Sequence, residues 1–246
     1  FIGTPQGCEI LNRPNESRIY KILAIKSLKY ATKIIVDSIR MQQKVYKLSQ
    51  IKAIVMKNGF NTASILNSQN NLQKKHLVVS IRMPTPLYRI KEICEARNSS
   101  KEKPKINFLY PAYDQDYKDI LFSSLKKEDC DFGILKRNEL YDILRNTLLA
   151  VSIPKSDSSP RSVYESIFAG ACVAVTYEKY IEELPECMRN RMYIVNLNDK
   201  FWMDKALKFA RNISEQPYLP SQEALDMCDQ NRTLKKLKDK IYKNVT

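Results

Sequence analysis

Short apolar segments alternate with amphipathic segments along most of the chain. Apolar runs rich in β-branched residues predict buried strands, and apolar positions three or four residues apart predict helices. We expect strands at residues 32–36, 53–56, 77–81, 106–110, 130–135, 148–153, 171–175 and 192–195. We expect helices at residues 16–30, 41–48, 87–96, 116–125, 138–145, 162–168, 201–212 and 221–244. Because this alternation is typical of βαβ units, the pattern predicts an α/β fold with a parallel sheet.

Residues 61–75 interrupt the alternation, since they are rich in Asn, Ser, Gln and Lys and contain few apolar positions. Such a composition predicts a linker. We therefore expect one unit in residues 1–75, which includes the linker, and a second unit in residues 76–220. A basic helix is expected in residues 221–246.

Polar residues gather where the strand 148–153 ends and the helix 162–168 begins. In an open parallel sheet, ligands bind at that edge. The amino end of a helix offers N–H groups and a positive dipole to an anion, and Arg161 adds a guanidinium suited to phosphate. Glu165, one turn into the helix, can accept hydrogen bonds from sugar hydroxyls. The stretch therefore predicts a site for a phosphorylated ligand rich in hydroxyl groups.

The 246 residues include 41 Lys and Arg against 27 Asp and Glu, a net charge of +14. This excess favours anionic partners such as nucleic acid, anionic lipid or phosphorylated ligands, although a compositionally biased genome also produces a Lys-rich surface. The basic residues are dispersed and no nucleic-acid-binding motif appears, so we expect no nucleic acid.

The six cysteines form no CxxC pair, and His76 is the single histidine. We therefore expect reduced thiols in a cytoplasmic protein and no bound metal. No apolar run approaches the roughly 18 residues of a membrane span. Because the sequence begins at Phe1, we expect an upstream portion of the protein.

Several segments resemble those of GT-B glycosyltransferases of the retaining, E-x7-E type. SIPKSDSSPRSVYESIFAGACVAV is similar to the acidic donor-binding segment of these enzymes, and its SPRSVYE portion also resembles exostosin-like glycosyltransferases. LVVSIRMPTPLYRIKEICEA resembles the segment that opens their second domain, while FIGTPQGCEI and IVMKNGFN resemble parts of the first. The resemblance implies a Rossmann-like parallel sheet with helices on both faces in residues 76–220. Residues 1–75 would be part of a first, acceptor-side α/β domain. Either this chain is a fragment, or the first domain is a separate chain, or the first domain is reduced.

The resemblance also implies roles for individual residues. Glu165 would hold the nucleotide ribose, and Asp157, eight positions earlier, would meet hydroxyls of the donor sugar; these two acids are the candidate catalytic residues. The strand end at 133–135 would receive the base. The residues expected to bind the donor nucleotide or its diphosphate are Arg82, Arg89, Ser158, Ser159, Arg161, Ser162 and Glu165.

Simpler interpretations stand beside these roles. Glu165 could be a solvated acid, and Asp157 a helix cap or a loop residue. Arg82 could be an ordinary surface cation. Arg161 could serve only to pair with a neighbouring acid.

The function implied by the resemblance is metal-independent transfer of a hexose from a UDP- or GDP-sugar to a saccharide or lipid-linked acceptor, with retention of configuration. No cofactor and no metal are expected, because arginines and a helix amino end can stabilise the diphosphate leaving group. The positive charge would suit a cytoplasmic protein that binds peripherally to an anionic membrane surface. The alternatives are a non-catalytic nucleotide-sugar-binding or scaffold subunit and, from the charge alone, a nucleic-acid-binding protein.

Overall fold

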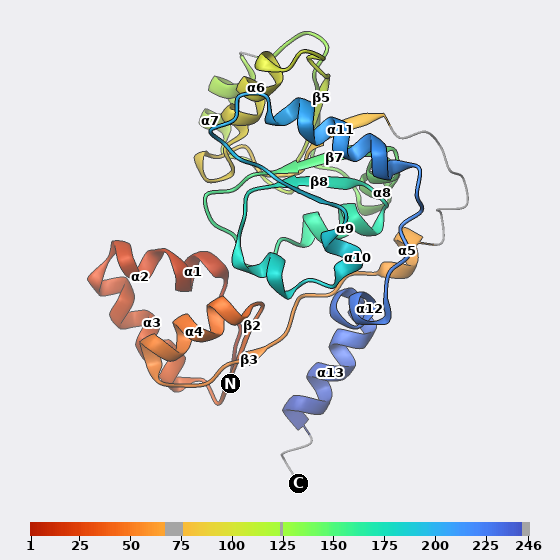
Figure 1. The fold of residues 1–246 in the computed structure, drawn as a ribbon. Coiled ribbons are helices and arrows are strands. Elements are labelled where there is room, and N and C mark those ends of the chain that lie inside the picture. Colours follow the sequence, from red (N-terminus) through yellow and green to blue (C-terminus); the bar gives the residue numbers. More distant parts are fainter. Residues whose placement is uncertain (67–75, 124, 243–246) are drawn as a thin grey trace.

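The computed structural model describes residues 1–66, 76–123 and 125–242 and contains two parallel sheets (Figure 1). The strand order is β1-β2-β3 in the smaller sheet and β6-β5-β4-β7-β8-β9 in the larger one. Every strand pairing within both sheets is parallel. The predicted α/β class and the parallel sheet are therefore confirmed.

The first unit surrounds the three-stranded sheet. Its elements are β1 (Ile2–Gly3), α1 (Gly7–Leu11), α2 (Arg13–Glu16), α3 (Arg18–Tyr30), β2 (Lys33–Val36), α4 (Ile39–Ser49) and β3 (Ile54–Val55). The hydroxyl of Ser17 caps α3 and that of Ser38 caps α4, each by accepting a hydrogen bond from a backbone N–H of the first turn. β1, α1 and α2 were not predicted from the sequence.

The second unit surrounds the six-stranded sheet. Its strands are β4 (Leu77–Ser80), β5 (Ile106–Leu109), β6 (Cys130–Gly133), β7 (Thr147–Ser152), β8 (Cys172–Val175) and β9 (Met192–Ile194). Its helices are η1 (Pro86–Tyr88), α6 (Ile90–Ser99), α7 (Gln115–Phe122), α8 (Arg137–Arg145), α9 (Arg161–Phe168), η2 (Lys179–Glu183), α10 (Glu186–Arg189) and α11 (Trp202–Ser214). The chain starts this sheet at β4, builds outward through β5 and β6, and then returns to β7 on the other side of β4. The edge beside β4 and β7 is therefore a topological switch point, where open α/β sheets bind ligands.

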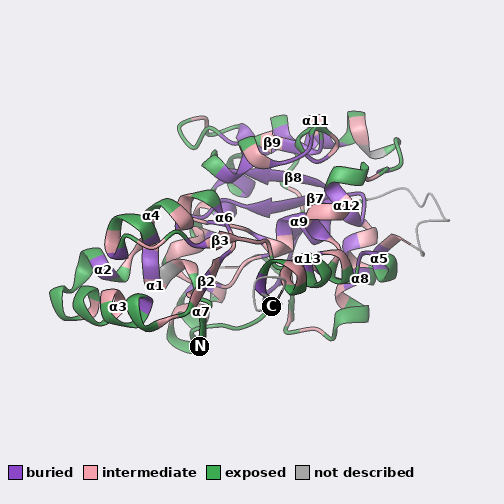
Figure 2. Ribbon diagram, turned by 90° about the horizontal axis from the view of Figure 1, so that it is seen from below, coloured by how far each residue is buried: buried purple, intermediate pink, exposed green. Residues whose placement is uncertain are grey.

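Helices cover both faces of this sheet, as the resemblance implied. Neighbouring strand residues point to opposite faces: Val79 and Ala150 join one core with residues of α8, α9 and α10, whereas Val78 and Leu149 join another with residues of α6, α7 and α11. The interior strands β7 and β8 are buried along their whole length (Figure 2).

Two sequence predictions were wrong. Part of the expected linker is a helix, α5 (Thr62–Leu66), and the expected tail helix is two helices, α12 (Gln222–Cys228) and α13 (Gln230–Tyr242). The tail breaks because Asp229 is extended and pairs with Phe60 as an isolated parallel bridge. The rest of the expected linker, 67–75, lies outside the described residues.

The tail helices contact the first unit. The end of the chain therefore links the two units. The ammonium of Lys33 in β2 donates a hydrogen bond to the carbonyl of Ile241 in α13 at 2.7 Å. Within residues 1–66, 76–123 and 125–242, no helix combines the length and the apolar character needed to span a bilayer.

Candidate functional site

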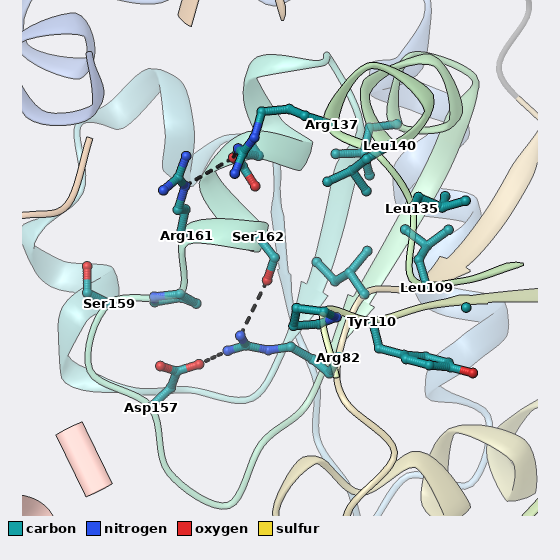
Figure 3. Close-up of a pocket in the computed structure, with 16 residues that line it drawn as sticks. Arg82, Leu109, Tyr110, Leu135, Arg137, Leu140, Asp157, Ser159, Arg161 and Ser162 are labelled. Atoms are coloured by element: carbon teal, nitrogen blue, oxygen red, sulfur yellow. Dashed lines mark hydrogen bonds and ion pairs between the residues drawn. The ribbon is translucent and has the colours of Figure 1, made fainter. Parts of the chain in front are cut away.

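A cavity of about 420 Å³ opens at the carboxyl ends of β4, β5, β6 and β7, at the switch point (Figure 3). Loops that follow these four strands supply its wall, together with the first turns of α8 and α9. Charged and hydroxyl side chains occupy one side, and the apolar side chains of Leu109, Leu135 and Leu140 occupy the other. The cavity therefore suits a ligand with one polar, anionic part and one flat, apolar part.

Arg82 lies at the centre of the polar side, two residues beyond β4. Its Nε donates a hydrogen bond to the hydroxyl of Ser152 at 2.8 Å, and its Nη1 donates one to Ser162 at 3.3 Å. Its Nη2 forms an ion pair with Asp157, and the ring of Tyr88 lies 4.9 Å from the guanidinium carbon. The side chain is only 12% exposed, and this burial lowers the pKa of Arg82. The interpretation as a surface cation is therefore wrong.

Glu165 is buried in α9, although it carries a charge. Its Oε1 accepts hydrogen bonds from Arg137 at 2.7 Å, from Arg161 at 3.1 Å and from the hydroxyl of Tyr141 at 3.2 Å. The hydrogen bond to Tyr141 and the charge of Glu165 raise the pKa of Arg137. Glu165 is thus no solvated acid. Arg161 does pair with a neighbouring acid, as its simpler interpretation had it, but it also lines the cavity.

The loop that carries Asp157 also contacts the first unit. The Oδ1 of Asp157 accepts a hydrogen bond from the N–H of Ser158 at 2.8 Å, and the Asp157 carbonyl accepts one from Arg40 at 3.3 Å. The hydroxyl of Ser158 donates to Asp37 at 3.2 Å. Burial raises the pKa of Asp37 above its ordinary value. The loop that carries Asp157 is therefore fastened to the first unit, through Asp37 in the β2–α4 loop and Arg40 at the start of α4.

The structure brings most of the predicted site residues together but separates two of them. Those that line the cavity are Arg82, Asp157, Ser159, Arg161, Ser162 and Glu165. Ser158 faces Asp37 instead. Arg89 lies beside a neighbouring hollow of about 300 Å³, and its Nη1 donates to the carbonyls of Ile153 and Pro154, at 3.3 and 2.8 Å. The guanidinium of Arg89 thus fastens the chain beyond β7 and is not paired with Arg82.

Arg137 and Tyr141 of α8 are site residues that the sequence interpretation missed. Arg137 lies two residues beyond the predicted strand 130–135, and its position at the same sheet edge was the available signal. Arg137 and Tyr141 both bind Glu165 because α8 packs against α9, and the sequence does not show this packing.

Asp131 lies behind the cavity wall and holds Tyr110 and Gly133, which line it; the sequence interpretation also missed this residue. Its Oδ1 accepts hydrogen bonds from the Tyr110 hydroxyl at 2.7 Å and from the N–H of Gly133 at 2.9 Å. Gly133 has a φ of 63°, a left-handed conformation that glycine adopts without strain. Lys118 forms an ion pair with Asp131 at 2.9 Å and lies 5.3 Å from the centre of the Tyr110 ring. These contacts fix the Tyr110 ring at the cavity wall.

The described residues contain no group of three His, Cys, Asp or Glu side chains that could hold a metal ion. The cysteines at positions 94, 130, 172, 187 and 228 are free thiols.

The two parallel sheets and the cavity at the switch point define the GT-B fold, as the sequence resemblance implied. The chain matches no protein-family model and no curated protein by sequence. Solved structures match it with low identity and high structural similarity. HepE from Anabaena, solved with UDP and glucose, is 12% identical with a TM-score of 0.76, over 98% of this chain and 70% of HepE.

Two other solved structures have the same fold. TarM from S. aureus is 14% identical with a TM-score of 0.70, over 96% of this chain and 49% of TarM. WaaG, a glycosyltransferase involved in lipopolysaccharide biosynthesis, is 14% identical with a TM-score of 0.65, over 85% of this chain and 62% of WaaG. At these identities the similarity establishes the fold, and the activity has to be argued from the cavity.

Proposed function

We propose that this protein is a glycosyltransferase that binds a nucleotide-diphosphate sugar in the cavity and transfers the hexose to a saccharide or lipid-linked acceptor. One observation carries the proposal: the buried carboxylate of Glu165 and the largely covered guanidinium of Arg82, whose side chain is 12% exposed, face the same cavity, opposite an apolar wall. A nucleoside diphosphate has this order of chemical groups, because its base is flat, its ribose carries hydroxyls and its phosphates are anionic.

In this arrangement the base lies along the apolar wall near Tyr110, and the ribose hydroxyls donate hydrogen bonds to Glu165. Arg137 and Arg161 hold the carboxylate of Glu165 in place from two sides. Arg82 and the amino end of α9 face the diphosphate, where they stabilise the negative charge that develops as the sugar leaves. The proposed transfer requires no metal and retains the configuration of the transferred sugar. A UDP-sugar is the first donor to test, because HepE was solved with UDP-glucose as well as with UDP.

A non-catalytic nucleotide-sugar-binding subunit is the second candidate. The observation that favours it is the ion pair between Asp157 and Arg82, which engages one of the two candidate catalytic acids within the protein. Release of nucleoside diphosphate from the donor, measured with a panel of saccharide and lipid-linked acceptors, distinguishes the two. Donor binding without any release would support the binding subunit.

The surface of α3 supports an approach to an anionic membrane as part of this proposal. Residues 17–36 contain basic side chains and no Asp or Glu. Ile19, Ile22 and Leu23 are 73%, 55% and 56% exposed on α3. Basic and apolar side chains on one exposed helix favour an anionic lipid surface. Co-sedimentation with vesicles tests this, and equal binding to neutral and to anionic vesicles would contradict it.

The donor site is tested by the thermal stability of the protein with UDP, GDP, ADP and their sugars. A ligand at about 100 times its Kd stabilises a protein by about 2.7 kcal/mol, which raises the Tm by about 5–10 °C at this size. In Glu165→Gln a charge-assisted hydrogen bond worth about 1.5–3 kcal/mol is lost, so binding should weaken by about 10- to 100-fold. Glu223→Gln, an exposed acid on α12, is the matched control and should bind normally. If none of these ligands raises the Tm of the wild type, the donor site is refuted.

A further inference from the structure

Every nitrogen of the Arg82 guanidinium already has a partner within the protein. Ser152 and Ser162 accept hydrogen bonds from Nε and Nη1, and Asp157 pairs with Nη2. The ring of Tyr88 lies over the guanidinium. A diphosphate that binds Arg82 must therefore take the place of at least one of these partners.

Asp157 is the partner that a diphosphate would replace, because both are anions. The side chains of Arg82 and Asp157 are only 12% and 15% exposed. At such low exposure a guanidinium without a counter-ion is strongly disfavoured, so Asp157 stabilises the ligand-free site. The same carboxylate repels an incoming diphosphate, and solvent screens this repulsion weakly.

The loop holds Asp157 close to Arg82 even when the ion pair is broken. The N–H of Ser158 binds the Asp157 carboxylate, and Arg40 binds its carbonyl. Arg40 is itself fixed by an ion pair with Glu178 at 3.0 Å. Because Arg40 holds the backbone of Asp157 and the Ser158 N–H holds its carboxylate, the negative charge stays near the site after the diphosphate has entered.

We propose that Asp157 is a built-in counter-ion of Arg82 that competes with the diphosphate and thereby limits the affinity of the site for nucleoside diphosphates. The inference rests on the donor site proposed above and gives Asp157 a role different from a contact with donor-sugar hydroxyls. The two roles predict opposite effects of neutralising Asp157. Loss of a sugar contact weakens binding of the nucleotide sugar, whereas loss of a competing charge strengthens binding of every diphosphate.

Isothermal titration calorimetry with two probes, UDP and inorganic pyrophosphate, tests the inference, and UDP-glucose is titrated for comparison. Asp157→Asn keeps the size of the side chain and removes its charge, so it should bind both probes at least about tenfold more tightly than the wild type. Asp157→Glu keeps the charge and should stay within about threefold of the wild type. Asp142→Asn removes an equal charge from a 70% exposed position outside the cavity, and should change affinity less than about twofold.

Each result supports or overturns the inference. Unchanged or weaker binding of both probes to Asp157→Asn overturns it, and so does weaker binding of a UDP-sugar with unchanged binding of UDP, which would favour the sugar contact. Tighter pyrophosphate binding without binding of any nucleotide supports the counter-ion and refutes the donor site. If no variant binds either probe, both ideas fail. Should circular dichroism show that Asp157→Asn does not fold, Asp157→Ser removes the same charge and is held to the same criterion.

Discussion

Gly59 lies where the chain leaves the first unit, directly against the start of α13. A Cβ atom at this position would be 2.5 Å from the hydroxyl oxygen of Thr233 and 2.7 and 2.8 Å from the Cα and N atoms of Gln230. The Thr233 hydroxyl can turn away, but the Gln230 atoms are backbone. We therefore predict that Gly59→Ala displaces the first turn of α13 and destabilises the protein.

The distances set the size of this effect. To restore an ordinary contact of 3.4 Å from 2.7 Å, the backbone of Gln230 must move by about 0.7 Å. Its N–H donates a hydrogen bond to the carbonyl of Phe60 at 2.9 Å, and a shift of this size stretches that bond beyond the hydrogen-bonding range. Overpacking costs about 1–3 kcal/mol and a lost hydrogen bond about 0.5–1.5 kcal/mol, so we expect a loss of about 2–4 kcal/mol in unfolding free energy.

Urea unfolding followed by far-ultraviolet circular dichroism measures this loss. The single tryptophan, Trp202, is buried beside the large sheet and reports on that unit separately by fluorescence. Hydrogen exchange of residues 222–242 shows whether the tail helices detach before the sheet unfolds. Gly3→Ala is the control, because its nearest atom is the Ala31 side chain at 3.2 Å, and it should change stability by less than about 1 kcal/mol. If Gly59→Ala unfolds within about 0.5 kcal/mol of the wild type with unchanged exchange of the tail, the steric argument is refuted.

Two further predictions concern buried titratable groups. Burial raises the pKa of Asp37, so the folded state binds its proton more readily than the unfolded state, and its contribution to stability falls as the pH rises above the ordinary Asp range. Asp37→Asn should therefore gain more stability over the wild type at pH 7 than at pH 4, and equal differences in the urea midpoint at both values would contradict this. Burial also raises the pKa of Cys94 to about 11 and that of Cys228 to about 12, so iodoacetamide at pH 8 should leave both thiols unmodified until urea is added. Mass spectrometry of the native protein checks this, and rapid labelling of either cysteine would show that it is accessible.

The strands of the large sheet could be predicted because each is a short apolar run with polar residues on both sides. The strand expected at 77–81 is Leu77–Ser80, and that expected at 106–110 is Ile106–Leu109. By contrast, β1 has two residues, too few for any periodic signal, and depends on its pairing with β2. The break between α12 and α13 could not be predicted either, because Asp229 is extended only through its pairing with Phe60, which is distant in sequence.

The position of the cavity was predictable, whereas the partners of its charged side chains were not. The polar loop after β7 and the start of α9 predicted a site at the sheet edge where the cavity opens, since parallel strands bring their carboxyl ends together there. Arg89 looked equivalent to Arg82 in sequence, but its left-handed backbone, with a φ of 52°, accompanies a side chain that binds the carbonyls of Ile153 and Pro154. The spacing of residues along the sequence does not show whether an arginine side chain binds a ligand or a nearby backbone carbonyl.

The two acids of the site differ in how readily their partners can be exchanged. The side chains of Arg137 and Arg161, which hold Glu165, are 51% and 39% exposed. When a ligand displaces them, water can therefore replace part of the hydrogen bonding that they lose. Arg82 and Asp157 are 12% and 15% exposed, and water cannot do the same for either. Since the arginines beside Glu165 stay in contact with water whereas Arg82 and Asp157 do not, the Glu165 end of the cavity can adjust at less cost than the Arg82 end. The affinity for a donor should therefore depend more on the charge of Asp157 than on either arginine beside Glu165.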